Sequence, residues 1–145
     1  MTAPAQPEAR VVPIRQEGDI VEARHQGRDL GEALGLGSMD LTMVATAISE
    51  IARNILNYAG EGEVELRTVE AGGRKGLEVV ARDQGPGIVD VDRALTDGYS
   101  TGKGLGLGLP GAARLMDAMA VDSGPGRGTT VTMTKWVSDA DRGRS

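Results

Sequence analysis

The segment from residue 101 to 111, TGKGLGLGLPG, has glycine at every second position from Gly102 to Gly108. A strand gains nothing from this pattern, because interior glycine raises the backbone entropy lost on folding and leaves no side chain to pack. A helix interior tolerates it no better. Pro110 follows, and proline suits the first turn of a helix. The segment therefore predicts a loop before a helix, either a mobile loop or one whose backbone approaches a ligand closely.

The composition restricts the class of protein. A chain of 145 residues with 39% hydrophobic residues predicts one domain with a substantial core. The absence of cysteine excludes disulfides, thiolate metal sites and cysteine nucleophiles. A net charge of −5 without a basic run argues against a nucleic-acid partner. Because no long apolar run or signal-peptide pattern occurs, we expect a cytoplasmic protein without membrane contact.

Periodicity and turn residues predict the order of the elements. We expect a strand at 11–16, a helix at 20–34 capped by Asp19, a helix at 39–58, strands at 64–70 and 76–83, a short helix near 90–96, a helix from 110 to about 119, and a hairpin around PGRG ending at 137. This order predicts an α+β fold, a two-layer α/β sandwich with helices on one face of a mixed, mostly antiparallel sheet. The domain would span 11–137, between disordered tails at 1–10 and 138–145.

The helix at 39–58 carries a polar face opposite its apolar stripe. Glu50, Asn54 and Asn57 share that face at spacings of four and three residues. The helix alone favours a solvated surface. Asparagine is a mediocre helix former, however. The alternative is that a carboxylate one turn from an amide oxygen holds a general base beside a magnesium ligand.

The motif ARDQGPGI, at 81–88, ends a predicted strand with a carboxylate. Asp83 is followed by Gly85 and Gly87 on either side of a proline. All three residue types favour tight turns, so a turn explains the motif. The alternative places Asp83 at the mouth of a pocket, where it accepts a hydrogen bond from a ligand amine. The glycines would then leave room for the ligand. The motif by itself leaves both interpretations open.

Two phosphate-binding patterns match the glycine segment only in part. Gly106, Gly108 and Gly111 have the spacing of a dinucleotide fingerprint, but no strand precedes them immediately. A P-loop would need one more residue, and Gly104 stands in the place of its Ser or Thr. What remains is a run of N–H groups leading into a helix N-terminus, which favours anions, with Lys103 as a charge for a phosphate. A plain flexible linker is the alternative.

The ordered set of motifs resembles a known family. A Glu…Asn helix, DxGxG, a glycine loop before a helix, and Gly128-Thr129 before the last strand resemble the GHKL ATP-binding fold of gyrase-type ATPases, histidine-kinase catalytic domains and anti-sigma-factor kinases. The resemblance covers about residues 11–137. The segments DIVEARHQGRDLGEALG, AISEIARNI, ARDQGPGI and DGYSTGKGLGLGLPGAARLMD are similar to the RsbT type of serine/threonine kinase from stressosome pathways.

This resemblance implies ATP and Mg2+ as cofactors and assigns roles by position. Glu50 would be the general base and Asn54 the magnesium ligand. Asp83 would contact the adenine amine, with Thr129 near the same ring. The other positions that the resemblance assigns to nucleotide binding are Gly85 and Gly87 beside the ring, Asn57 on the helix, and the lid residues Gly102, Lys103, Gly104, Leu105, Gly106, Leu107 and Gly108. Relatives vary at Asn57 and Lys103, so the resemblance supports those two assignments less than the others.

The resemblance also implies a function. We expect a protein kinase that phosphorylates a STAS-domain antagonist and, once released, binds and activates a PPM-type phosphatase in partner switching. An RsbW-like anti-sigma factor kinase that holds a sigma factor is one alternative. A non-catalytic ATP-binding adaptor is another, and it would not need Glu50. A histidine-kinase fragment would need a phosphoacceptor, but His25 lacks the acidic neighbour and proline of such a site.

Overall fold

A computed structural model describes residues 8–87 and 108–138 of the chain. The elements in chain order are β1 (Ala9–Ile14), α1 (Glu17–Leu34), α2 (Ser38–Tyr58), β2 (Gly62–Ala71), β3 (Arg74–Asp83), α4 (Gly108–Leu115), β4 (Ala118–Ser123) and β5 (Thr129–Trp136). The helix expected near 90–96 and the expected lid residues 102–107 lie outside the described part.

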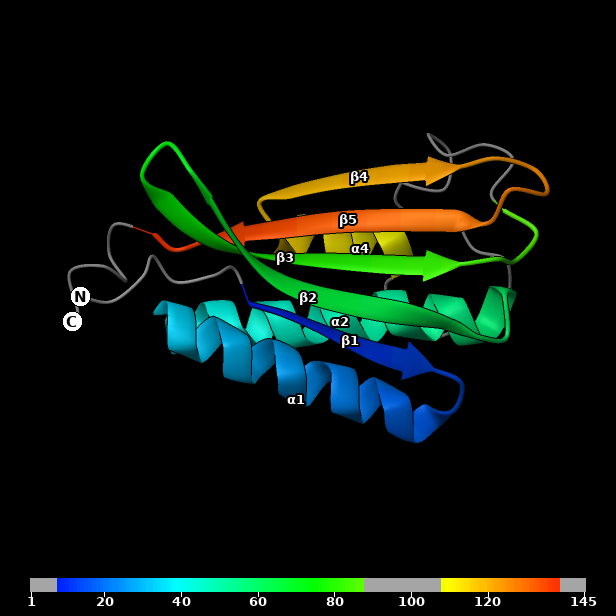
Figure 1. Cartoon of the computed structure of the whole chain (residues 1–145), viewed down its shortest axis with the longest axis horizontal. Helices are drawn as coiled ribbons and strands as arrows, with labels where there is room; N and C mark the ends of the chain where they lie inside the picture. Colours follow the sequence, from blue (N-terminus) through cyan, green and yellow to red (C-terminus); the bar gives the residue numbers. More distant parts are fainter. Residues whose placement is uncertain (1–7, 88–107, 139–145) are drawn as a thin grey trace.

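The five strands form one sheet in the order β1-β2-β3-β5-β4. All four strand pairs are antiparallel, so the parallel pairing that the sequence prediction allowed does not occur among the described strands. β1 is an edge strand, where the missing N–H of Pro13 breaks no ladder between two neighbours. Helices α1, α2 and α4 lie on one face of the sheet (Figure 1). The predicted two-layer α+β sandwich is therefore confirmed.

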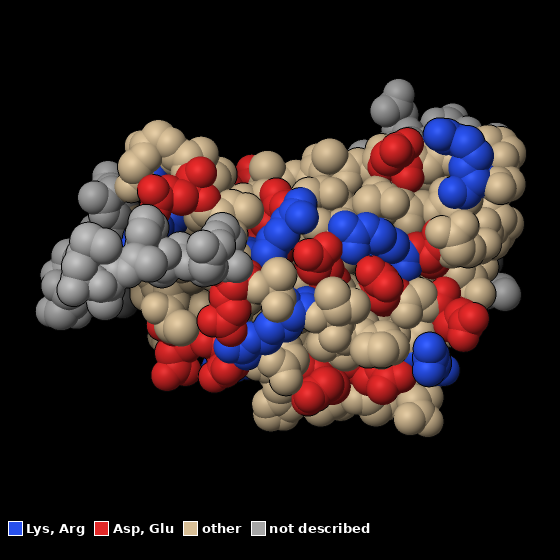
Figure 2. Space-filling view, in the orientation of Figure 1, with Lys and Arg blue, Asp and Glu red and all other residues tan. Residues whose placement is uncertain are grey.

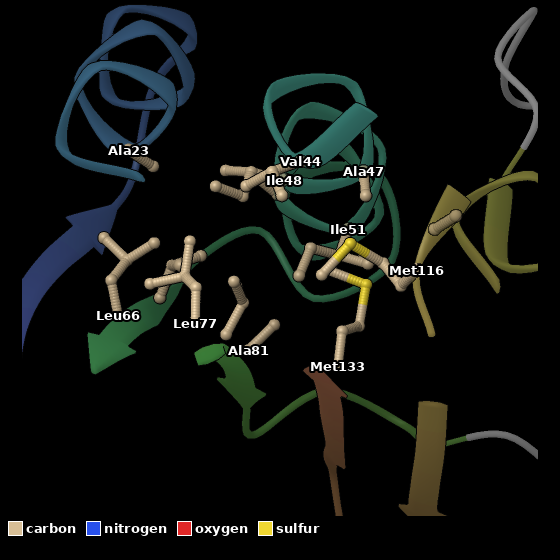
Figure 3. Packing of buried hydrophobic residues seen from close by; sticks show 14 of the residues in the cluster. Ala23, Val44, Ala47, Ile48, Ile51, Leu66, Leu77, Ala81, Met116 and Met133 are labelled. Atoms are coloured by element: carbon tan, nitrogen blue, oxygen red, sulfur yellow. The ribbon is translucent and has the colours of Figure 1, made fainter. Parts of the chain in front are cut away.

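The core lies between α2 and the sheet. In Figure 3, Val44, Ile48 and Ile51 of α2 face side chains of the central strands, among them Leu77 and Met133. All five are at most 1% exposed. Burying each such side chain contributes about 1.5–3 kcal/mol, and this is what fixes α2 over the sheet. The apolar stripe predicted from the periodicity of α2 is confirmed.

Two predicted helix ends are wrong. α1 begins at Glu17, and Asp19 lies within its first turn instead of capping it. The Asp19 carboxylate reaches back and accepts hydrogen bonds from the backbone N–H groups of Arg15 (2.8 Å) and Gln16 (3.1 Å). α4 ends at Leu115 and does not reach residue 119, because the N–H of Asp117 already bonds to a β5 carbonyl and the chain enters β4.

The face of the sheet away from the helices is polar. Figure 2 shows acidic and basic side chains interspersed on it. Arg82 of β3 pairs with Glu63 (3.1 Å) and Glu65 (2.9 Å) of β2, and Arg67 pairs with Glu78 across the same two strands. These cross-strand pairs balance charge locally on a solvated surface. Within residues 8–87 and 108–138, no helix has the length and apolar character needed to cross a membrane.

Candidate functional site

The candidate site begins at one end of the sheet, where β3 terminates. Asp83, the last residue of β3, is opposite Gly62 of β2 and Thr129 of β5. It alternates in register with the buried residues Val79 and Ala81, so its side chain lies on the helix-covered face. The carboxylate therefore has a neighbour without a side chain on one side and a hydroxyl on the other.

Glycines bring the end of α2 close to this carboxylate. A Cβ at Gly62 would lie 2.9 Å from the Ile55 side chain and 3.1 Å from the Cβ of Asp83. At Gly85 a Cβ would lie 2.7 Å from that of Ala59. The Gly85 N–H donates to Oδ1 of Asp83 at 2.9 Å, which orients the carboxylate. The structure thus brings Asp83 and Gly85 together at the C-terminal end of α2.

The segment after β3 packs backbone to backbone on the β4–β5 turn. A Cβ at Gly87 would lie 2.0 Å from the Gly124 carbonyl oxygen, and one at Gly128 would lie 2.2 Å from the Asp83 carbonyl oxygen. Both glycines have φ near +80° (82° and 75°), where other residues are strained. The N–H of Gly126 also donates to the Pro86 carbonyl at 2.8 Å. This close contact fixes the loop that carries Gly85 and Gly87 against the turn before Thr129.

The Thr129 hydroxyl has a partner that the sequence analysis missed. Its Oγ1 lies 2.8 Å from Oγ of Ser123, and Ser123 Oγ also donates to the Gly128 carbonyl at 2.9 Å. Ser123 ends β4 and is opposite Thr129 in the hairpin. The signal was available in part, since the predicted hairpin around PGRG would place Ser123 opposite Thr129 once its register is known.

The polar face of α2 leads away from Asp83 toward α4. Glu50, Asn54 and Asn57 are all half-buried. Glu50 Oε2 accepts a hydrogen bond of 3.0 Å from the N–H of Gly108, the first residue of α4. A carboxylate at a helix N-terminus is favourable because the helix dipole is positive there. Glu50 is thus in contact with α4, and a plain solvated face does not describe this part of α2.

The site has two ends joined by α2. From Glu50 to Ala59 the helix rises about 14 Å, at 1.5 Å per residue. Asp83 offers a hydrogen-bond acceptor at one end, and the N-terminus of α4 attracts anions at the other. Asn54 and Asn57 lie on the polar face between them. This arrangement suits an elongated ligand with a donor group at one end and an anionic group at the other.

A divalent cation would need ligands from more than one source. Among residues 8–87 and 108–138, no group of three or more His, Cys, Asp or Glu side chains forms a metal cluster. Asn54 and Glu50 supply oxygen atoms one helical turn apart, and oxygen is what magnesium prefers. Magnesium keeps waters and shares phosphate ligands readily, so this donor set fits a cation carried by a phosphorylated ligand.

Of the predicted lid, the structure places only Gly108, which lies at the α4 N-terminus beside Glu50. The positions expected to cover phosphates, Gly102, Lys103, Gly104, Leu105, Gly106 and Leu107, fall outside the described residues. The predicted site residues that the structure does place fall into two groups. Asp83, Gly85, Gly87 and Thr129 gather at the end of β3, and Glu50, Asn54 and Asn57 follow α2 toward Gly108.

Comparison with known proteins is consistent with this geometry. Residues 12–135 match the family model of the histidine kinase-like ATPase domain. The chain is 48% identical over 126 residues to the serine/threonine-protein kinase RsbT of Bacillus subtilis, covering 87% of this chain and 95% of RsbT. It is also 31% identical over 104 residues to the anti-sigma F factor of a Thermoanaerobacter species, covering 68% and 71% of the two chains.

Two solved structures share the fold. The chain aligns with the RsbU and RsbW domains of a Mycobacterium tuberculosis protein at a TM-score of 0.60 and 22% identity, covering 92% of this chain and a third (33%) of that one. It aligns with the mycobacterial sensor histidine kinase MprB at a TM-score of 0.55 and 17% identity, covering 90% and 96%. At such identities the likeness supports the two-layer architecture and nothing finer.

Proposed function

The chain belongs to the histidine kinase-like ATPase domain family, and from that premise we propose that it is a protein serine/threonine kinase. It would transfer the γ-phosphate of ATP to a hydroxyl group of a partner protein. The observation that carries the proposal is the placement of Glu50 at the N-terminus of α4, on the same helix whose other end contacts the Asp83 loop. The likeness to RsbT over 87% of the chain supports the protein-kinase activity.

The site residues that the resemblance assigns then have roles in the proposed reaction. Bound ATP supplies the phosphoryl group, and magnesium neutralises its charge. Asp83 accepts a hydrogen bond from the adenine amine, with Gly85 and Gly87 beside the ring and Thr129 near it. Asn54 holds the cation through its amide oxygen, and Asn57 lies next to it along α2. The residues from Gly102 to Gly108, Lys103 included, are proposed to close over the phosphates.

Glu50 is the proposed general base. It would take the proton from the acceptor hydroxyl as the phosphoryl group is transferred. Oε2 of its carboxylate accepts from the Gly108 N–H in this structure. An ionised carboxylate has about four lone-pair sites on its two oxygens, so Glu50 can keep this hydrogen bond and take the proton through another site. The Glu50–Gly108 bond would then hold the carboxylate in place during the proposed reaction.

The proposed substrate is a STAS-domain antagonist with an acceptor Ser or Thr. Phosphorylation adds a charge of about −2 to the interface and so releases the kinase. The released kinase would bind and activate a PPM-type phosphatase in the cytoplasm. The similarity to RsbT and to an anti-sigma F factor supports a partner-switching pathway of this kind.

An RsbW-like anti-sigma factor kinase is the second candidate. The 31% identity to an anti-sigma F factor favours it, and it predicts retention of a sigma factor in a pull-down. A non-catalytic ATP-binding adaptor is the third candidate. It would not need Glu50 as a general base, and the carboxylate at the α4 N-terminus would then have only a structural role.

Phosphotransfer tests the proposal. The protein is mixed with magnesium-ATP and a STAS-domain protein encoded near it, and intact masses are recorded. We expect one added phosphate on the STAS-domain protein, lost in Glu50→Ala. Glu32→Ala, which removes an exposed carboxylate from α1, is the matched control and should keep the activity. Bound ATP without transfer to a competent partner would contradict the kinase and favour the adaptor.

A further inference from the structure

Two neighbours in the described part of the chain lie within hydrogen-bond distance of the Ser123 hydroxyl, which has one proton to donate. Its Oγ lies 2.9 Å from the Gly128 carbonyl oxygen and 2.8 Å from Oγ1 of Thr129. A carbonyl oxygen only accepts hydrogen bonds, so the Ser123 proton is committed to Gly128. The bond between the two hydroxyls must then use the proton of Thr129. Thr129 donates to Ser123 and keeps only lone pairs for anything else that approaches it.

The same count of hydrogen-bond donors and acceptors can be made for the end of the site at Asp83. Thr129 and Asp83 are directly opposite in the β3–β5 ladder and lie on the same face of the sheet. An ionised carboxylate is an acceptor only. With the Thr129 proton held by Ser123, two adjacent side chains present acceptors and neither presents a proton. A ligand edge that meets them is favoured if it carries N–H donors and disfavoured if it carries a carbonyl oxygen.

We propose that Ser123 is a specificity-determining positioning residue that makes this end of the site select an adenine over a guanine nucleotide. The proposal rests on the proposed function, since it concerns the base of the nucleotide substrate. Adenine presents an exocyclic amine where guanine presents a carbonyl oxygen. Without the Ser123 hydroxyl, the Thr129 hydroxyl is free to rotate and donate to that carbonyl. Ser123 thereby acts on the base through Thr129.

The backbone around Ser123 holds this arrangement in place. Gly128, which accepts the Ser123 proton, packs so closely that a Cβ on it would lie 2.2 Å from the Asp83 carbonyl oxygen. Ser123 and Thr129 are paired across the β4–β5 ladder. The Gly128 carbonyl, the Ser123 hydroxyl and the Thr129 hydroxyl therefore all belong to the one β4–β5 hairpin. The direction of the Thr129 proton is built into the fold and does not need a bound ligand.

The nucleotide selectivity of this 145-residue chain tests the inference. Dissociation constants for magnesium-ATP and magnesium-GTP are measured by titration calorimetry, and the ratio Kd(GTP)/Kd(ATP) is compared between variants. We expect Ser123→Ala to lower this ratio about tenfold, the worth of about one hydrogen bond. Ser123→Thr, which keeps a hydroxyl, should restore the wild-type ratio. Thr132→Ala removes a hydroxyl from the opposite face of β5 and should leave the ratio unchanged.

A double variant separates this role from a merely structural one. Adding Thr129→Val to Ser123→Ala removes the hydroxyl whose rotation admits guanine, so the ratio should rise again toward the wild-type value. General loosening of the hairpin would instead lower it further. Ser123→Cys, close in size but a weak hydrogen-bond partner, should reproduce the change if Ser123→Ala fails to fold.

The outcomes distinguish this inference from the function on which it rests. A wild-type ratio retained in folded Ser123→Ala or Ser123→Cys would overturn the role of Ser123 and leave the kinase intact. Wild-type protein that binds neither nucleotide would overturn the proposed function, and the inference with it. A ratio that falls in Ser123→Ala and recovers in the double variant supports both.

Discussion

The two ends of α4 are each held by a charged side chain, but in different surroundings. At its N-terminus the Gly108 N–H donates to the Glu50 carboxylate at 3.0 Å. At its C-terminus the Leu115 carbonyl accepts from the Lys135 ammonium at 2.9 Å. Both charges complement the helix dipole. Lys135, however, is only 8% exposed, whereas Glu50 is half-buried on the polar face of α2.

The surroundings of Lys135 show why its end of α4 is fixed. Besides Leu115, its ammonium lies 3.7 Å from Asp40 of α2 and 3.9 Å from Asp117. Asp117 in turn accepts from the N–H of Trp136 at 2.7 Å. Removing one partner from a buried ionic group is strongly destabilising, so this cluster ties α4, α2 and β5 together. α4 is therefore anchored at its C-terminus, whereas its N-terminus bonds to the carboxylate that the proposed chemistry needs.

The largest expected effect comes from the Glu50 end. Glu50→Gln should lower the rate of phosphotransfer about 10²- to 10⁴-fold, the usual contribution of a general base. Its amide oxygen can still accept from Gly108, so the free energy of unfolding should change little. Single-turnover phosphotransfer and urea denaturation measure the two quantities. A normal rate would show that Glu50 is not the base, and a large loss of stability would show that this end is an anchor as well.

The anchored end should show the opposite pattern. Lys135→Met keeps the apolar stem but leaves Asp40, Asp117 and the Leu115 carbonyl without their cation. We expect the free energy of unfolding to fall by about 2–3 kcal/mol, measured by urea denaturation. ATP affinity of the folded protein should stay within about twofold, because the change lies at the far end of α4.

Lys75→Met, at an exposed lysine, is the matched control for this substitution and should leave stability nearly unchanged. A loss as small as that of the control would show that the buried lysine is not an anchor. The two ends of α4 would then differ only in exposure.

Asp83→Asn probes the site at the end farthest from Gly108. One carboxylate oxygen is already used by the Gly85 N–H, and an amide oxygen can replace it there. The adenine amine would then meet an amide and lose a charged acceptor, so we expect ATP affinity to fall about tenfold. Titration calorimetry measures it, with Asp122→Asn on the exposed edge strand as control. Unchanged affinity in Asp83→Asn would contradict the adenine contact.

Local features were sufficient to predict most of the fold. The 3.6-residue stripe of the helix at 39–58 fixes which face is buried, and that face packs on the sheet. Turn residues between alternating segments located both hairpins, at Gly72 and Gly73 and again at 124–128. The start of α1 was missed because Asp19 also has the chemistry of an N-cap, although it acts three residues into the helix.

The site required information that local patterns do not carry. The resemblance assigned a role to Glu50, but its bond to Gly108 depends on how α2 and α4 pack. The contact of Ser123 with Thr129 depends on the register of the last hairpin. Lys135 did leave a signal, because it occupies a core-facing position in the alternation of β5 after Val131 and Met133. A charge at such a position indicates a buried partner.

The smallest effect should come from the ion pair within the Lys135 cluster. Asp40→Asn weakens a contact of 3.7 Å whose carboxylate side chain is 23% exposed, while the 2.9 Å bond from Lys135 to Leu115 stays in place. We expect a loss of about 0.5–1 kcal/mol, as is typical of partly exposed pairs. Combining it with Lys135→Met in a double-mutant cycle gives the coupling energy directly. A coupling energy above about 2 kcal/mol would show that the Lys135–Asp40 ion pair contributes more than the hydrogen bond from Lys135 to the Leu115 carbonyl. Lys135 would then be anchored mainly to α2.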